Sequence, residues 1–154
     1  MKKVMTLSFL SNEHSILLGL KKRGSGVGKW NGFGGKVEGN EMIEDAAIRE
    51  VVEESKVIPN KLKKIGVLNF SFSQDEQKKI ETHIFKIEDF SGTPMETDEM
   101  KPKWFKFAEI PFNQMWSTDR LWLQYVIDNT CFKGEFLLDN GNIIEYKINK
   151  VGNF

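Results

Sequence analysis

Short runs of apolar residues, separated by polar turns, make up most of this chain. They predict strands, because β-branched, aromatic and aliphatic residues are enriched in runs of this length. In the run 66–72, Leu68 and Phe70 fall on one side and Asn69 on the other, as expected for a strand with one buried face. The predicted strands are residues 4–10, 15–20, 66–72, 80–87, 103–107, 134–138 and 143–148.

Polar stretches between these runs predict tight connections. Residues 11–14 would join the first two strands as a hairpin, and residues 73–79 would form a polar hairpin loop. Asn140-Gly141 between two apolar runs is the strongest short-range signal for a further hairpin. Pro59-Asn60 indicates a break, after which residues 61–64 are expected to be solvated.

Two segments follow a helical period instead. In residues 35–57, Ile43, Ala46 and Val51 share one face, and Asn40 is the expected N-cap. Acidic residues in the first turn suit the helix dipole. Residues 121–127 predict a second, buried helix. With strands in the majority, the mixture implies a β-rich sandwich with helices on both faces, forming a single domain over residues 1–154.

The first helix contains a physical conflict. Its apolar arc also carries Glu50, Glu53 and Glu54, and clustered carboxylates both repel one another and resist burial. A bound divalent cation would resolve the conflict, because hard cations take oxygen ligands. A solvated acidic face is the alternative. Glu41 adds a fourth acid near the helix start, and Arg49 is spaced to pair with Glu53.

Composition narrows the function. The formal net charge is zero, which disfavours a nucleic-acid polymer as partner, and no apolar run is long enough to span a membrane. The basic and then apolar N-terminus fits a first strand better than a signal peptide. Cys131 is the single cysteine, so a reducing compartment is expected. We expect a cytoplasmic monomer, with nuclear or mitochondrial location as the alternative in a eukaryote.

The acidic helix resembles the Nudix box, in which a glycine, a glutamate and an Arg-Glu-aliphatic-any-Glu-Glu sequence recur at fixed spacing. One position departs from the motif, because Lys56 stands where the family has its second glycine. That glycine ends the helix in a left-handed conformation, in which lysine costs about 1 kcal/mol. The matching residues are Gly35, Glu41, Arg49, Glu50, Val51, Glu53, Glu54 and Val57.

Outside the box, the chain is similar to the MutT-type branch of the Nudix family and, within it, to enzymes that act on oxidised purine nucleoside triphosphates. The residues that carry this likeness are 18–24, 29–37, 92–100 and 110–112, together with Met115-Trp116. The resemblance implies an α/β (α+β) fold, an α/β/α sandwich whose mixed central sheet is flanked by helices. It also implies Mg²⁺-dependent hydrolysis, with Mn²⁺ as an alternative metal. Substrates such as 8-oxo-dGTP and 2-hydroxy-dATP would yield the monophosphate and pyrophosphate.

Site residues carried over from the resemblance fall into two groups. The metal group is the Gly35 backbone with Glu50, Glu53, Glu54 and Glu99, and Arg49 completes the catalytic set. One of these glutamates would accept the proton of the attacking water, and the sequence leaves open which one. The substrate group is Thr6, Lys21, Asn31, Phe70, Met100, Trp116, Thr118 and Asp119.

In the substrate group, Phe70 and Trp116 would enclose the purine and Lys21 would contact phosphate. The family reads the base edge with two adjacent aspartates, whereas this chain has Thr118-Asp119. That departure puts in doubt the range of bases accepted. A Nudix pyrophosphatase for alkylated purine triphosphates or for a nucleoside diphosphate linked to another group stays open. So does a non-catalytic nucleotide-binding module.

Overall fold

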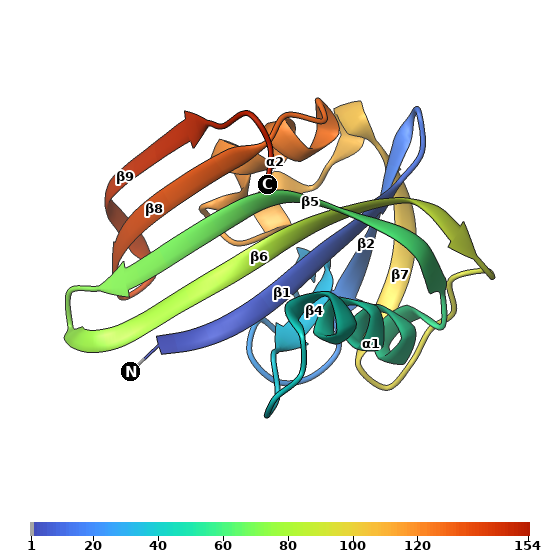
Figure 1. Cartoon of the computed structure of the whole chain (residues 1–154), viewed down its shortest axis with the longest axis horizontal. Helices are drawn as coiled ribbons and strands as arrows, with labels where there is room; N and C mark the ends of the chain where they lie inside the picture. Colours follow the sequence, from blue (N-terminus) through green and yellow to red (C-terminus); the bar gives the residue numbers. More distant parts are fainter. Residues whose placement is uncertain (1) are drawn as a thin grey trace.

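The computed structural model describes residues 2–154. Its order of elements mixes strands and helices (Figure 1). The elements are β1 (Lys2–Ser11), β2 (Ser15–Lys21), β3 (Trp30–Asn31), β4 (Phe33–Lys36), α1 (Ile43–Ser55), β5 (Ile58–Phe72), β6 (Asp75–Ser91), β7 (Met100–Lys106), α2 (Asp119–Ile127), β8 (Phe132–Asp139) and β9 (Asn142–Lys150), with 3-10 turns at Phe107–Glu109 and Phe112–Gln114.

Within residues 2–154, the strands form one mixed sheet in the order β3-β2-β1-β6-β5-β8-β9. In addition, β4 pairs with β1 and β7 pairs with β2. The pairs β1–β6 and β5–β8 are parallel, and the others are antiparallel. The expected mixed sheet is therefore present, and β1 and β6 lie at its centre.

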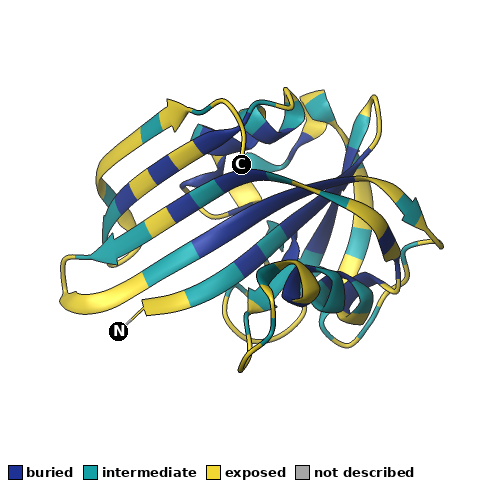
Figure 2. Ribbon diagram, in the orientation of Figure 1, coloured by how far each residue is buried: buried dark blue, intermediate teal, exposed yellow. Residues whose placement is uncertain are grey.

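The helices cover opposite faces of this sheet, α1 on the near side in Figure 1 and α2 on the far side. Successive residues of one strand alternate between the two faces. Thus Phe9 packs in the cluster that contains Trp122 of α2, while Leu10 packs with Val51 of α1. Figure 2 shows the buried positions gathered on the central strands, where both faces are covered. The predicted sandwich is confirmed.

All the predicted strands exist, but the ribbon formed by β5 and β6 is longer than the pattern suggested. The two strands pair from Ile58↔Ser91 to Phe72↔Asp75, with several register shifts. The expected break at Pro59-Asn60 is wrong, and the expected loop 73–79 is only a turn at residues 73–74. The reason is that many side chains at the ends of this ribbon are exposed, so backbone pairing holds polar residues in strand conformation there.

The glycine-rich stretch before α1 also forms strands. Trp30–Asn31 and Phe33–Lys36 lie outside the strands predicted from the sequence, yet they are β3 and β4. Both are too short to show an alternating pattern. β4 pairs with β1 near the middle of the sheet, and β3 pairs with β2 at the end of the strand order.

The ends of α1 differ in how well they were predicted. Asn40 is not the N-cap, because Glu41 N–H donates to Glu38 O and the resulting turn delays the helix until Ile43, with Met42 at the cap position. At the other end, Lys56 adopts φ +64°, and its N–H donates to Val52 O at 3.0 Å. The lysine therefore takes the left-handed conformation of the motif glycine. Among residues 2–154, no helix is both long enough and apolar enough to cross a bilayer.

Candidate functional site

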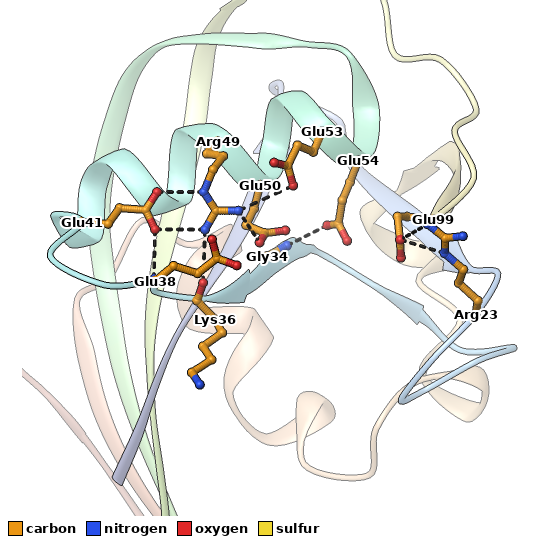
Figure 3. Close-up of polar contacts among 10 residues, drawn as sticks. All are labelled: Arg23, Gly34, Lys36, Glu38, Glu41, Arg49, Glu50, Glu53, Glu54 and Glu99. Carbon is orange, nitrogen blue, oxygen red and sulfur yellow. Dashed lines mark hydrogen bonds and ion pairs between the residues drawn. The ribbon is translucent and has the colours of Figure 1, made fainter.

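Glu54 is the buried acid of α1. Its side chain lies between the helix and β4, and only 4% of the residue is exposed. The Gly34 N–H donates to Glu54 Oε1 at 2.9 Å (Figure 3). Burial raises the pKa of Glu54 to about 7, opposed by the Gly34 N–H and Lys21 and assisted by the neighbouring charges of Glu50 and Glu99. This carboxyl would gain most from a nearby cation.

Glu50 lies against Gly35 of β4. A Cβ on Gly35 would meet Glu50 Oε1 at 2.6 Å, so any larger residue there would displace this carboxylate from its present position. Burial raises the pKa of Glu50, and Arg49 opposes the rise. Glu53 differs, because 57% of its side chain is exposed. The three glutamates therefore share one side of the helix but are buried to very different extents.

Arg49 joins the start and the middle of α1. Its Nε and Nη2 donate to the two carboxylate oxygens of Glu41 at 2.7 and 3.0 Å, and Nη1 donates to Glu50 at 2.8 Å. The predicted contact with Glu53 is also present, at 3.5 Å, but it is the longest of these. Hydrogen bonding to Arg49 lowers the pKa of Glu41 to about 2. Glu41 thus holds the arginine in place, and the arginine in turn orients Glu50 (Figure 3).

Glu99 reaches the site from the segment before β7. Arg23 Nε donates to Glu99 Oε1 at 2.8 Å, and this hydrogen bond lowers the pKa of Glu99. Figure 3 places Glu99 beside Glu54, on the side away from Glu50. Its role as a metal ligand stays a prediction, because here it is paired with arginine.

A divalent cation fits this donor set in part. Across residues 2–154, no three His, Cys, Asp or Glu side chains converge closely enough to hold a metal by themselves. All the predicted donors are oxygens, however, and Mg²⁺ commonly uses one or two carboxylates while phosphate and water complete its octahedron. Glu50 and Glu54, with the Gly35 carbonyl, therefore suit a half-site that a polyphosphate would complete.

A cavity of about 500 Å³ begins at this acidic end and extends to the N-terminus of α2. It is lined by Gly35 and Glu54 and by all the residues of the predicted substrate group, namely Thr6, Lys21, Asn31, Phe70, Met100, Trp116, Thr118 and Asp119. The fold thus brings residues from distant parts of the chain to one hollow. A concave site of this size is typical of small-molecule binding.

Sequence reasoning missed several lining residues. Phe72, Trp122, Lys29 and Lys78 also line the cavity. The alternation of 66–72 already placed Phe72 on the same side as Phe70, and that signal could have identified it. The two lysines carried no such signal, because nothing local shows which way a surface lysine points.

A larger hollow of about 610 Å³ lies over the outer strands and includes Asn69, Glu135 and Lys147. None of the box glutamates lines it. We place the site in the cavity of about 500 Å³, because Glu54 of the motif and all the residues of the predicted substrate group line it.

The aromatic rings that line the cavity pack against neighbouring residues. Lys29 Nζ lies 5.2 Å from the centroid of the Trp116 ring, and a Cβ on Gly26 would meet Trp116 Cζ2 at 3.1 Å. On the other wall, Phe70 stacks on Phe136 with ring centroids 5.5 Å apart. Both rings are therefore held by neighbours while they line the cavity.

Buried polar atoms without partners mark the base end. Among the described residues, Asp119 Oδ2 and Trp122 Nε1 have no hydrogen-bond partner, although both side chains line the cavity. Burial raises the pKa of Asp119 to about 7, and the positive charge of Lys29 is among the groups that oppose the rise. Buried polar groups in folded proteins normally have a partner, so these two atoms are available to a bound ligand that supplies complementary donors and acceptors.

The comparison with known proteins decides the family. A family model described as the NUDIX domain matches residues 1–126. The chain belongs to the Nudix family. The Nudix box is therefore the α1 segment described above, and its motif glycine position is filled by Lys56 in the same left-handed conformation.

Named relatives extend over nearly the whole length of this Nudix chain. It is 44% identical over 150 residues to the Danio rerio protein named "Oxidized purine nucleoside triphosphate hydrolase", covering 97% of this chain and 96% of that one. The Mus musculus protein of the same name is 39% identical over 153 residues, covering 99% and 97%. A MutT protein from Bacillus halodurans has the same fold, with TM-score 0.85, 21% identity and coverage of 96% and 97%.

Proposed function

We propose that this Nudix protein hydrolyses oxidised purine nucleoside triphosphates, with 8-oxo-dGTP as the main substrate, to the nucleoside monophosphate and pyrophosphate. One observation carries the proposal. A single cavity is lined by Glu54 and Gly35 at one end and by Phe70, Trp116 and Asp119 at the other. This arrangement supports a ligand that has a polyanionic group and a planar base. The names of the two relatives support the same substrate class.

Charge placement assigns a task to each residue at the phosphate end. A bound Mg²⁺ would neutralise the triphosphate and polarise the attacking water. Glu50, Glu53 and Glu54 would hold the cation, with the Gly35 carbonyl and Glu99 as further oxygen donors. Lys21 lines the same cavity and would contact phosphate as a point charge. Water attacks a phosphorus of the α–β anhydride and its proton passes to one of these glutamates. The P–O bond to the bridging oxygen breaks, which gives the nucleoside monophosphate and pyrophosphate.

At the base end, aromatic rings would stack on the face of the purine, and Asp119 would form hydrogen bonds with the edge of the base. Phe70 and Trp116 provide apolar surfaces for stacking. Asp119 can donate as well as accept while it is protonated, and it only accepts once ionised. Thr118 is 6% exposed and can donate or accept, but it cannot carry charge. We therefore propose a narrower range of oxidised bases than a pair of aspartates would allow.

A nucleotide panel tests this proposal. The panel contains 8-oxo-dGTP, dGTP, 2-hydroxy-dATP, an alkylated purine triphosphate and a nucleoside diphosphate sugar, each assayed with Mg²⁺, with Mn²⁺ and with a chelator. We expect pyrophosphate as product, dependence on the cation, and kcat/KM for 8-oxo-dGTP at least about tenfold above dGTP. Equal values for those two substrates would refute the base assignment. Binding without turnover of any compound would indicate a non-catalytic module.

A pair of tryptophan variants separates base stacking from general packing. Trp116→Ala should raise KM for 8-oxo-dGTP by about tenfold, because one aromatic wall is lost. Trp104→Ala is the matched control, since Trp104 is similarly exposed but does not line the cavity. A similar KM change in both variants would show that Trp116 has no specific role.

A further inference from the structure

The segment between β6 and β7 runs from the C-terminal end of α1 to the edge of the cavity. Its start is attached to the C-terminal end of α1, where Met95 N–H donates to Ser55 O at 2.9 Å. Its end carries Glu99 and then Met100, which is buried and lines the cavity. Between these two points lies Thr97, a residue to which neither the motif nor the resemblance gave a role.

The Thr97 hydroxyl makes three hydrogen bonds. It donates to the backbone carbonyl of Glu54 at 3.0 Å, and it accepts the backbone N–H groups of Glu99 and Met100, both at 3.3 Å. A threonine hydroxyl has one donor and two acceptor positions, so its capacity is fully used. One side-chain oxygen therefore joins the acidic helix to the start of β7, where Met100 lines the cavity.

These contacts hold the site residues from both sides. The carboxylate of Glu54 is bound by the Gly34 N–H, while the carbonyl of the same residue is bound by Thr97. Met100 pairs with Lys21 across β2 and β7, so its position also affects the lysine expected at phosphate. The last carbonyls of a helix have no partner within the helix, and here the 92–99 segment supplies donors to them.

Further bonds fix the orientation of Thr97 itself. Its N–H donates to Met100 O at 3.0 Å, which closes a tight turn around the hydroxyl. From outside, Lys22 Nζ donates to Thr97 O at 2.9 Å and to Glu96 at 2.7 Å. These bonds fix the backbone of Thr97, and rotation of its side chain would break the three hydrogen bonds of the hydroxyl.

We propose that Thr97 is a positioning residue for the hydrolysis. Its hydroxyl sets the spacing between the α1 carboxylates and the Glu99–Met100 segment, and so the alignment of the groups around the triphosphate end of the bound nucleotide. This inference rests on the proposed function, although its effect on metal binding does not depend on the identity of the base. Small displacements of reacting groups, of about 1 Å, can lower a rate about a hundredfold.

The main test replaces the hydroxyl with a methyl group of similar shape. Thr97→Val leaves the Glu54 carbonyl without its donor and two N–H groups without their acceptor. We expect kcat on 8-oxo-dGTP to fall at least about tenfold with a smaller change in KM, because binding contacts remain while alignment is lost. Thr97→Ser keeps the hydroxyl and should restore most of the activity. Thr93→Val, an exposed change in the same segment, should behave like the parent protein.

A second readout needs no turnover. The affinity of the protein for Mn²⁺, measured by electron paramagnetic resonance, should fall about tenfold in Thr97→Val and recover in Thr97→Ser. If the parent protein does not hydrolyse 8-oxo-dGTP, the proposed function fails, and the Mn²⁺ affinities still decide the role of Thr97. A lower melting temperature with unchanged kcat per folded molecule and unchanged Mn²⁺ affinity would overturn the inference, because that result describes a purely structural residue.

A milder variant covers the case in which Thr97→Val does not fold. Lys22→Met removes the outer bonds to Thr97 and Glu96, and the Lys22 side chain is partly exposed, so the core is not disturbed. We expect kcat and Mn²⁺ affinity to change in the same direction as in Thr97→Val, by about threefold. Values equal to those of the parent protein in both Lys22→Met and Thr97→Ser, together with a misfolded Thr97→Val, would also overturn the inference.

Discussion

Asp119, at the base end of the cavity, should make the free energy of unfolding depend on pH. Its carboxyl is 4% exposed and has one oxygen without a partner among the described residues. Burial raises its pKa from 3.8 to about 7. Between these values, the unfolded chain has lost the proton and the folded chain still holds it. Because the folded state binds more protons there, the free energy of unfolding falls as pH rises through this range.

The magnitude follows from the shift. A difference of about three pKa units corresponds to a total loss of about 4 kcal/mol once both states are ionised. Most of this loss falls inside an experimentally accessible window, about 2.5 kcal/mol between about pH 5 and about pH 8. Asp119→Asn cannot ionise, so it should lose about 2.5 kcal/mol less than the parent protein across the same window.

The assay is urea unfolding of both proteins at the two pH values. Asp128→Asn serves as control, because Asp128 lies just past the other end of α2 and is exposed. Comparing the change with pH, rather than stability at one pH, cancels the titration of other acids such as Glu54. If the parent protein and Asp119→Asn show the same pH slope, the carboxyl is not buried as described, and its use in reading a base edge loses its support.

Three further substitutions test the geometry of the site. Arg49→Lys keeps the charge but cannot bind Glu41 and Glu50 at the same time. The kcat should therefore fall at least about tenfold, with the far-ultraviolet circular dichroism spectrum unchanged. A kcat equal to that of the parent protein would show that Arg49 does not orient Glu50. Gly35→Ala places a Cβ 2.6 Å from Glu50 Oε1 and so displaces this carboxylate. The metal concentration at half-maximal rate should rise about tenfold. An unchanged value would show that Glu50 is not a ligand. Gly26 has φ +82°, and a Cβ at this position would lie 3.1 Å from Trp116 Cζ2. In Gly26→Ala, KM should therefore rise more than kcat falls. A loss confined to kcat would contradict the role of this loop in holding the Trp116 ring.

Helix α1, with glutamates on its apolar face, could be predicted from the sequence because its signals are local. The period of Ala46, Ala47 and Val51 gave the buried face, and the glutamates on the same arc gave the conflict. Its start could not be predicted, because the Glu41 carboxylate accepts the Glu38 N–H while Arg49 holds it from eight residues away. That arrangement depends on the folded helix, so residue type alone favoured Asn40.

The strands of the core were predictable for the same reason, and the outer ribbon was not. β8 alternates between buried and exposed positions, which Figure 2 shows as stripes. The ends of β5 and β6 carry exposed polar residues on both faces, so pairing rather than pattern determines their conformation.

The candidate site shows the same division. The box residues follow from one contiguous motif, and the substrate group followed from the family resemblance. Lys29 and Trp122 required the fold, because they come from a glycine-rich loop and from α2 and meet only in the cavity. The Thr97 junction also required it, since a single threonine in a loop carries no sequence signal for three simultaneous hydrogen bonds.

A magnesium titration of 8-oxo-dGTP hydrolysis by the parent protein and by Glu54→Gln tests the central claim most directly. Glu44→Gln, an exposed change in the first turn of the same helix, is the control. The account predicts saturable Mg²⁺ activation in the parent protein and in the control, and a kcat lower by about a hundredfold or more in Glu54→Gln with the fold intact. Mg²⁺-dependent turnover in Glu54→Gln at the rate of the parent protein would contradict it.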